Sequence, residues 1–426
     1  MDVLVATDLT PPSNTGSLDG LVVLDLTRIL AGPTCTQLLG DLGAEVIKIE
    51  RPVKGDDTRA WGPPFLQDEH GNDMQESAYY LCANRNKSSV AVDIATKEGV
   101  QIIKNLAKNA DILVENFKVG DLEKRGLSYQ DLKQVNPKLV YCSITGFGQT
   151  GPYAKRAGYD FLAQGMGGIM ALTGFPEEEG GQPTKIGVGV TDVMCGMYAA
   201  TAILAAIHSR QSTGNGQHID ISLLDSQVAW LINQGTSYLT SGDVPGRIGN
   251  SHPTIVPYQT FNASDKPFII AVGNDGQFER LCQIAGAPEL ASDARFKHNF
   301  DRVRNRKELI PLLKELTPQM TSEEWISKLE DVGVPCGPVN TMDEVFENPQ
   351  IQHRGMKLEM EYPSAKEGHV NLISNPIKLS GTPVQYRKAP PKLGADTLET
   401  LLQHTKLNPE EIENLAKQGI LDLGGD

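Results

Sequence analysis

Asp192 carries the strongest chemical signal in the sequence. A glycine-rich run, 187–189, precedes it, and an apolar segment of small residues, 199–207, follows it. This pattern predicts that a strand or loop ends and a buried helix begins, so the carboxylate lies at a helix N-terminus, where free N–H groups and the helix dipole favour its ionised form. An ionised, partly desolvated carboxylate in a glycine-lined cleft can act as a nucleophile. The local sequence alone favours a simpler role for Asp192, that of a helix N-cap.

Three arginines, Arg28, Arg51 and Arg59, fall in predicted turns on one side of the fold. The second and third belong to the segment 50–61, which also holds Lys54 and ends in Trp61. Clustered guanidinium groups before an aromatic ring suit an anionic, partly aromatic ligand, which they bind through forked hydrogen bonds and stacking. The alternative is an ordinary solvated run of charges.

Other common catalytic signatures do not occur in the sequence. No G-x-G-x-x-G follows the first predicted strand, and there is no Walker lysine and no G-x-S-x-G elbow. The eight histidines are scattered without metal-ligand spacing, so we expect no metal site. His252 stands in a glycine-rich loop before a proline, where a structural role is the commoner one.

Strands and helices alternate along the first half of the chain. Strands are expected at 21–26, 45–50, 111–115, 139–144 and 218–222, and helices at 34–42, 97–108, 129–135 and 223–234. Such alternation predicts a parallel sheet with right-handed crossovers, and ligands bind outside the carboxyl ends of its strands. The turns at 27–33, 51–59, 116–120 and 145–152 all belong to that side.

Composition limits the class of protein. The chain has 426 residues, too many for one ordinary core, and a net charge of −14, which argues against nucleic-acid binding but leaves an anionic substrate open. The longest apolar segment, 198–207, is too short to span a membrane. Six well-separated cysteines and an N-terminal segment without Lys or Arg predict a cytoplasmic protein, or a mitochondrial one if a presequence has been removed.

The chain is expected to form two domains. After a flexible leader, 1–18, a large α/β domain covers 19–225 and resumes at 336–426 after a return linker. Between them a linker, 226–255, rich in Gly, Ser and Pro, leads to a smaller α+β domain, 256–335, with amphipathic helices at 304–316 and 322–331.

Several long motifs run through nearly the whole chain. They are LDLTRILAGPTCTQLLGDLGAEVIKIERP (24–52), NRNKSSVAVD (84–93), ENF (115–117), ITGFGQTGPYAKRAGYDFLAQ (144–164), GVTDVMCGMYAA (189–200) and GNDGQF (273–278). With these motifs the chain resembles the class III CoA-transferases. DDTRAWGPPF (56–65), YYLCANRNKSS (79–89), VPYQTF (256–261) and NRKELI (305–310) are similar to the branch that transfers CoA from succinyl-CoA to glutarate or hydroxymethylglutarate. The resemblance implies a Rossmann-like large domain and an interlocked homodimer.

The resemblance also implies roles for individual residues. Asp192 aligns with the family's nucleophile, which forms an aspartyl-CoA thioester without a metal or redox cofactor. The implied CoA contacts are Ile29, Leu30, Ala31, Arg51, Val92, Asp93, Ile94, Ala95, Asn116, Phe117, Lys124, Arg125, Ala157, Gly158, Tyr159 and Asp160. Leu30 replaces a glutamine of formyl-CoA transferase, which argues against formyl or oxalyl transfer, and Ala157 replaces a lysine.

The substrates implied are a CoA thioester and a small carboxylic acid. The glycine-rich loop 246–251, with Gly246, Arg247 and Gly249, is the expected lid, and His252 follows it. For the second carboxylate of a dicarboxylic acid we expect an arginine: Arg28, Arg59, Arg85 or Arg247.

Two alternatives remain at this stage. The α-methylacyl-CoA racemases have the same fold and use a histidine in a G-H-D motif, which here reads Gly158-Tyr159-Asp160. Tyrosine, with an ordinary pKa of about 10, is a poor base at neutral pH, so transfer is favoured over racemisation. The other alternative is an acyl-CoA binder without catalysis, which a turnover assay would distinguish.

Overall fold

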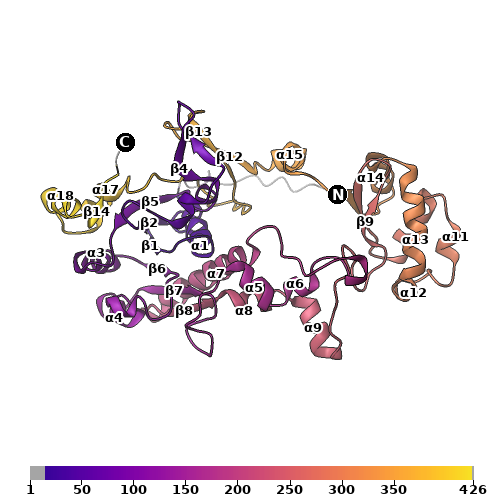
Figure 1. Ribbon diagram of the computed structural model, residues 1–426, viewed down its shortest axis with the longest axis horizontal. Helices are drawn as coiled ribbons and strands as arrows, with labels where there is room; N and C mark the ends of the chain where they lie inside the picture. The colour runs from indigo at the N-terminus through magenta and orange to yellow at the C-terminus, as the bar shows by residue number, and fades with distance from the viewer. Residues whose placement is uncertain (1–14, 425–426) are drawn as a thin grey trace. The chain divides into compact units, whose positions relative to one another are not determined.

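A computed structural model describes residues 15–424, and the remaining part of the expected leader, 1–14, lies outside the described residues. The chain divides into two compact units (Figure 1). Unit 1 comprises the residues up to Gly168, Ile186–Thr236 and the residues from Gln350 onward. Unit 2 comprises Ile169–Lys185 and Ser237–Pro349.

Unit 1 is built on a seven-stranded sheet of order β14-β5-β2-β1-β6-β7-β8. Its strands are β1 (Val22–Leu26), β2 (Glu45–Glu50), β5 (Lys87–Val92), β6 (Ile112–Glu115), β7 (Val140–Thr145), β8 (His218–Ser222) and β14 (Leu421–Asp422). Every pairing is parallel except that of β14 with β5. The predicted α/β class with a large, mainly parallel sheet is therefore confirmed. The strand missed by the pattern, β5, begins with Lys87, Ser88 and Ser89, which are buried despite their polarity.

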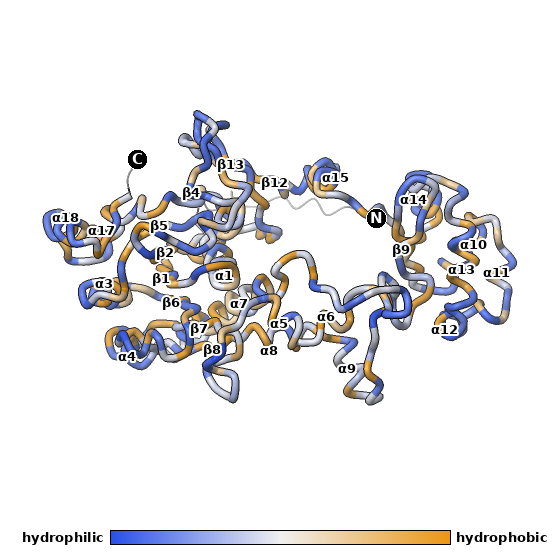
Figure 2. The backbone as a smooth tube through the Cα atoms, in the orientation of Figure 1, coloured by the Kyte–Doolittle hydropathy of each residue, from blue (hydrophilic) through white to orange (hydrophobic). Residues whose placement is uncertain are grey.

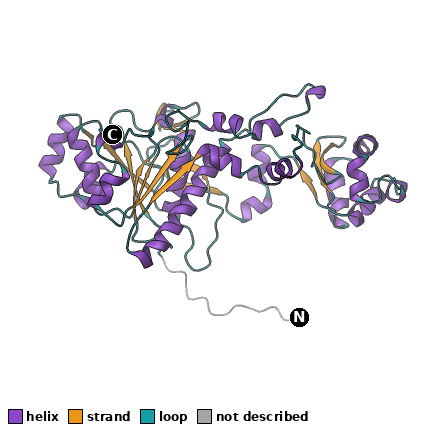
Figure 3. Ribbon diagram, turned by 90° about the horizontal axis from the view of Figure 1, so that it is seen from below, coloured by secondary structure: helices purple, strands orange, loops and turns teal. Residues whose placement is uncertain are grey.

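Helices cover both faces of this sheet (Figure 3). On one face α3 and two helices near the C-terminus pack on apolar side chains such as Leu24 and Ile47; on the other, α1 and α7 pack on Val23 and Val114. Figure 2 shows hydrophobic residues along the central strands and mostly hydrophilic ones on the outer helix α18. The helices of unit 1 are α1 (Ala31–Asp41), α2 (Ala78–Leu81), α3 (Lys97–Ala107), α4 (Tyr129–Val135), α5 (Asp160–Met166), α7 (Val190–Thr213), α8 (Leu223–Ala229), α17 (Thr397–His404) and α18 (Pro409–Lys417).

Helix α7 is packed closely against α1. A Cβ atom on Gly196 would lie 2.6 Å from the carbonyl oxygen of Ala31, so only glycine allows this approach. Among the described residues, one helix, α7, has the length and the apolar composition that a membrane span requires. Half of its most apolar stretch is buried inside the protein. The prediction that no segment reaches that length was wrong, because the helix runs from Val190 to Thr213 instead of over 198–207.

Unit 2 has a separate core around a three-stranded antiparallel sheet of order β11-β10-β9. Phe268 and Trp325 stack in this core with ring centroids 5.8 Å apart. Its strands are β9 (Tyr258–Asn262), β10 (Pro267–Ala271) and β11 (Cys336–Pro338), and its helices are α6 (Ile169–Leu172), α10 (Asp275–Ile284), α11 (Glu289–Ser292), α12 (Asn299–Arg304), α13 (Arg306–Leu316), α14 (Ser322–Asp331) and α15 (Met342–Glu347).

The boundaries of the two units differ from the expected domains in three segments: 169–185, and the parts of the two expected linkers, 237–255 and 336–349, that belong to unit 2. Residues 169–185, expected in the large domain, belong to unit 2, because Gly249 N–H donates to the carbonyl of Gly174 at 3.0 Å and Arg247 Nε to that of Phe175 at 3.0 Å. The expected helix 223–234 is broken after Ala229, and the expected linker contains α9 (Ile232–Ser241).

The remaining elements are short. They are the hairpins β3 (Phe65–Gln67) with β4 (Asp73–Ser77) and β12 (Lys357–Glu361) with β13 (His369–Ile373), the helix α16 (Pro349–His353), and the 3-10 turns η1 (Asp57–Ala60), η2 (Glu123–Arg125), η3 (Glu177–Glu179) and η4 (Thr317–Gln319). The described end of the expected leader is tied to unit 1, since Leu18 N–H donates to the carbonyl of Leu42.

Candidate active site

A cleft of about 260 Å³ opens beside Asp192 in unit 1. Its walls come from the turns that follow β1, β6 and β7 and from the first turn of α7, so it lies at the carboxyl ends of the parallel strands, as predicted. The lining residues include Arg28, Ile29, Leu30, Ala31, Asn116, Phe117, Lys118, Asp121, Arg156, Ala157, Gly158, Tyr159 and Asp192.

A second cavity of about 140 Å³ adjoins the first, because Arg28 and Phe117 line both. It is bounded by Arg51, Val92, Asp93, Ile94, Ala95 and Arg125, together with the residues beneath the β1 turn. We refer to the two adjoining cavities together as the groove: Asp192 lines the larger one, and two arginines, Arg51 and Arg125, line the smaller one. A groove of this form suits a long ligand that is anionic at the end remote from Asp192.

Nearly all the residues expected to contact CoA line this groove. Two do not: Lys124 is largely exposed and pairs with Asp121 at 3.1 Å, and Asp160 is placed behind the wall. Close backbone approach shapes that wall, since a Cβ atom on Gly158 would lie 2.4 Å from the Cα of Gly146.

Asp160 caps the helix that carries Asp192. Its carboxylate accepts hydrogen bonds from the backbone N–H groups of Thr191 at 2.8 Å and Asp192 at 3.3 Å, and from the Gln164 side chain at 2.7 Å. The N-cap position of α7 is Gly189, and Asp192 is its third residue. Asp192 is therefore not the N-cap of α7. The Asp160 side chain, from another helix, accepts the hydrogen bonds that an N-cap side chain would accept.

The environment of Asp192 favours its protonated form. The residue is 8% exposed. Burial raises the pKa of Asp192, and the negative charge of Asp160 raises it further, to about 7. The N-terminus of α7 favours the ionised form of this carboxylate, whereas loss of hydration and the neighbouring Asp160 raise its pKa above the ordinary value. A carboxylate with a pKa near neutrality exchanges readily between its acid and its nucleophilic form.

Tyr79, in α2, is a neighbour of Asp192 that the sequence did not indicate. Burial raises the pKa of its phenol to about 12, and the charges of Asp192 and Asp160 contribute. Its ring meets that of Trp61 edge-on, with centroids 5.2 Å apart. Its place in a tyrosine pair within α2 gave no signal separating it from Tyr80, which is fully buried.

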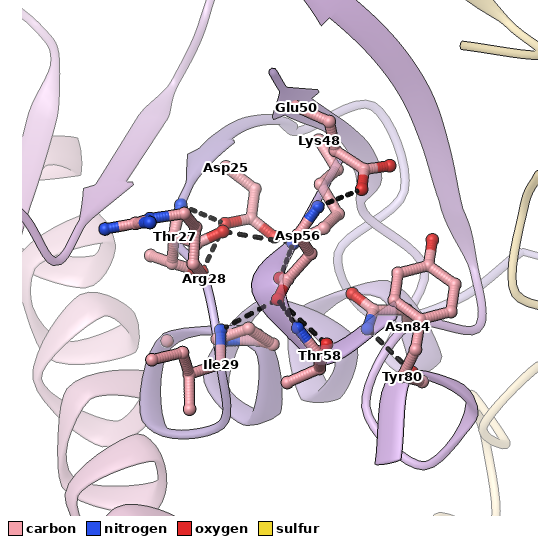
Figure 4. Close-up of polar contacts among 12 residues, drawn as sticks. Asp25, Thr27, Arg28, Ile29, Lys48, Glu50, Asp56, Thr58, Tyr80 and Asn84 are labelled. Carbon is pink, nitrogen blue, oxygen red and sulfur yellow. Dashed lines mark hydrogen bonds and ion pairs between the residues drawn. The ribbon is translucent and has the colours of Figure 1, made fainter. Parts of the chain in front are cut away.

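The turn between β1 and α1 is strained. Ile29, a β-branched residue, has φ 73°, in the left-handed region that normally requires glycine and costs such a residue about 1–3 kcal/mol. Side chains from elsewhere hold this turn (Figure 4). Asn116 accepts from Arg28 N–H at 3.0 Å and donates to the Arg28 carbonyl at 2.7 Å, and Asp56 accepts from Ile29 N–H at 3.2 Å.

Buried charges lie beneath the turn (Figure 4). The Lys48 ammonium, fully buried, donates to the Thr27 carbonyl at 3.0 Å and to Asp56 at 2.8 Å. Burial by itself would raise the pKa of Asp56, but the Lys48 charge holds it at about 2. Asp25, also fully buried, accepts from Thr27 and pairs with Lys87 at 3.1 Å. Lys48 lies in a predicted strand, where nothing in the sequence indicated this role.

Two arginines expected at the acceptor position serve the fold instead. Arg59 is 3% exposed and pairs with Glu50 at 2.8 Å and Glu76 at 2.9 Å. Arg85 is equally buried and pairs with Asp41 at 2.6 Å. Sequence shows the charge of an arginine but not its burial, so neither is available to hold a substrate carboxylate.

Arg28 is the expected arginine that lies in the groove. It is partly exposed, pairs with Asp57 and lies over the Phe117 ring, 5.8 Å from its centroid. Arg247, Gly246, Gly249 and His252 all belong to unit 2, and the His252 ring accepts from Thr254 N–H, which fits a structural role. Within residues 15–424 no group of three or more His, Cys, Asp or Glu side chains could hold a metal ion.

Comparison with known proteins agrees with this geometry. The family model CoA-transferase family III matches residues 18–397. The chain is 45% identical to the succinate–glutarate CoA-transferase of Agrobacterium fabrum, over 92% of this chain and 96% of that one, and 43% identical to the human succinyl-CoA:glutarate CoA-transferase, over 96% and 91%. A crystal structure of a CAIB/BAIF family protein from Brucella suis superposes with a TM-score of 0.82 at 48% identity, covering 92% of this chain and all of that one. The expected family is confirmed: the chain belongs to CoA-transferase family III.

Proposed function

We propose that this protein transfers CoA from succinyl-CoA to glutarate, with Asp192 as the covalent nucleophile. The observation that carries the proposal is the pair of adjoining cavities, one lined by two arginines and the other by the buried carboxylate of Asp192, whose pKa is about 7. The choice of substrates is supported by the relatives from Agrobacterium fabrum and human, which are named for succinate or succinyl-CoA and glutarate.

The proposed reaction proceeds through Asp192 in four acyl transfers. The Asp192 carboxylate attacks the thioester carbonyl of succinyl-CoA. The C–S bond breaks, the CoA thiolate is released, and a mixed anhydride between Asp192 and the succinyl group forms. The thiolate then attacks the Asp192 carbonyl and releases succinate, which gives an aspartyl-CoA thioester. A glutarate carboxylate attacks this thioester, and the freed thiolate attacks the glutaryl carbonyl, which yields glutaryl-CoA and regenerates Asp192. Each nucleophile and leaving group is a carboxylate or a thiolate, so we expect no cofactor.

The groove supports each part of this chemistry. Arg51 and Arg125, in the smaller cavity, would hold phosphate groups of CoA. Arg28, which lines both cavities, would hold a second carboxylate, and Arg156 also lines the larger cavity. Burial of Asp192 limits access of water, whose attack would hydrolyse the anhydride and the thioester. At the racemase histidine position Tyr159 is 61% exposed, and a tyrosine there would be a weak base.

Three further elements of the proposal concern the whole enzyme. The loop 246–251 acts as a lid, the active enzyme is a homodimer, and it works in the cytoplasm. Large exposed hydrophobic side chains, among them Phe161, Met197 and Leu239, support a dimer. Light scattering on the purified protein should give twice the chain mass of 46.2 kDa.

Mass spectrometry after incubation with succinyl-CoA tests the nucleophile. Hydroxylamine should convert an aspartyl thioester to a hydroxamate, and borohydride should reduce it to an alcohol, with the mass change confined to the peptide that contains Asp192. Asp192→Ala should abolish both the label and transfer while CoA binding stays nearly intact. Asp121→Ala removes another carboxylate of the cleft and should leave the label in place. Transfer by Asp192→Ala near the wild-type rate would refute the assignment.

A further inference from the structure

The strained turn forms a wall directly beside the helix that carries Asp192. Ile29, Leu30 and Ala31 line the cleft. A Cβ atom on Gly189, the residue before α7, would lie 3.0 Å from the Leu30 side chain. Any shift of this turn would therefore change the space between the wall and the Asp192 carboxylate.

Contacts from the turn's neighbours hold its backbone at successive positions. Lys48 holds the Thr27 carbonyl and Asp56 holds the Ile29 N–H, while the two side chains bind each other at 2.8 Å. Each side chain thus bonds to the turn with one contact and to its partner with another. Releasing them would free Ile29 to relax toward a negative φ, which is where a β-branched residue is most stable.

The Lys48–Asp56 pair contributes little to the stability of the fold. Both side chains are fully buried, and the loss of hydration on burying two charges offsets most of their attraction. A buried pair that instead fixes an unfavourable backbone conformation at the substrate wall has a functional use.

We propose that Lys48 and Asp56 are positioning residues, which keep Ile29 left-handed and so set the wall of the cleft against Asp192. The inference rests on the proposed function, because its test measures CoA transfer. Both residues line the smaller cavity together with Arg51, and neither lines the cleft that contains Asp192.

A double-mutant cycle with Ile29 tests the proposal. Lys48→Met with Asp56→Ala removes both charges together, so that neither is left buried and unpaired. We expect a loss in kcat of about 10- to 100-fold, with KM for succinyl-CoA changed by less than about 3-fold, because Arg51 and Arg125 still hold the nucleotide end. Glycine adopts positive φ without steric cost. In the I29G background the same pair of substitutions should therefore lower kcat by no more than about 3-fold.

The matched control is the buried pair Asp41–Arg85, which lies away from the turn. Asp41→Ala with Arg85→Met should lower the melting temperature, but it should change kcat by the same factor with and without I29G. Equal losses for the Lys48–Asp56 substitutions in both backgrounds would overturn the proposal, and so would an Ile29-dependent effect in the control.

A second variant covers a failure to fold. If Lys48→Met with Asp56→Ala shows no cooperative melting, Lys48→Met with Asp56→Leu removes the same charges and fills the space of the Asp56 side chain, and the same cycle with I29G gives the answer. Wild-type turnover and an inactive Asp192→Ala are measured first, so that failure of the proposed function is recognised independently of the cycle.

Discussion

Two carboxylates meet at the first turn of α7: Asp192, which belongs to this turn and lines the cleft, and Asp160, which comes from α5 and does not line it. Asp160 holds the helix N–H groups, and its charge acts on Asp192, whose pKa is about 7. The helix cap therefore also tunes the nucleophile, because a negative charge so close makes ionisation of Asp192 harder.

Asp160→Asn should move the pH profile. Asparagine keeps the hydrogen-bond acceptor for α7 but lacks the charge, so the pKa of Asp192 should fall while burial still holds it above its ordinary value. In the wild type, kcat/KM for succinyl-CoA should rise as the pH increases through about 7, and in the variant this rise should occur at lower pH. The measurement is the pH dependence of kcat/KM.

The control for that profile is Asp121→Asn, which removes a cleft carboxylate that does not bond to α7 and should leave the midpoint in place. An unchanged midpoint in Asp160→Asn would contradict the assigned interaction.

The sequence predicted the site residues that belong to family motifs. It did not predict the residues whose role depends on a tertiary contact. Asp192 and most groove residues followed from family motifs. The capping role of Asp160 and the buried Lys48–Asp56 pair depend on contacts between segments distant in the chain, which no local pattern encodes. The same reason explains the error over Arg59 and Arg85, whose partners Glu50 and Asp41 lie on β2 and α1.

At the scale of elements, the packing of α7 on α1 fixes the active-site end of both helices. Gly196→Ala should destabilise the protein by about 1–3 kcal/mol, since the new methyl group would meet the Ala31 carbonyl at 2.6 Å and the helices must move apart. Thermal denaturation measures this loss.

Thr201→Ala, on an exposed part of α7, is the matched substitution and should change the free energy of unfolding by no more than about 0.5 kcal/mol. Similar melting temperatures for both variants would show that the two helices tolerate a wider separation.

Elements with a clear period were predicted well from sequence, for example helix 129–135 and strand 218–222. Strand β5 was missed because polar side chains occupy its buried first half, where Lys87 pairs with Asp25 and Ser89 donates to Glu50 at 2.6 Å. The break after α8 was missed because nothing in the apolar pattern signals the positive φ of Ile232.

At the scale of the whole molecule, the two units have separate hydrophobic cores. Leu329→Ala in the core of unit 2 should lower the stability of that unit by about 2–5 kcal/mol. CoA, bound in the groove of unit 1, should raise the stability of unit 1 by about 2.7 kcal/mol at a free concentration 100 times Kd. Differential scanning calorimetry should therefore show one transition lowered by the substitution and another raised by CoA.

Leu113→Ala, equally buried in unit 1, is the control and should lower the transition that CoA raises. A single transition that responds to both Leu329→Ala and CoA would mean that the units unfold together.

The pairing of β5 with β14 has a consequence for synthesis of the chain on the ribosome. Val92 pairs with Leu421, and Asp93 N–H donates to the Ile420 carbonyl at 2.8 Å, so one wall of the groove is completed by residues made more than 300 positions later. The main segment of unit 2, Ser237–Pro349, emerges whole before then. Domains usually fold from the N-terminus during translation. In this chain the second unit can fold first, and the nascent enzyme cannot complete this wall of its CoA groove until the residues of β14 have been made.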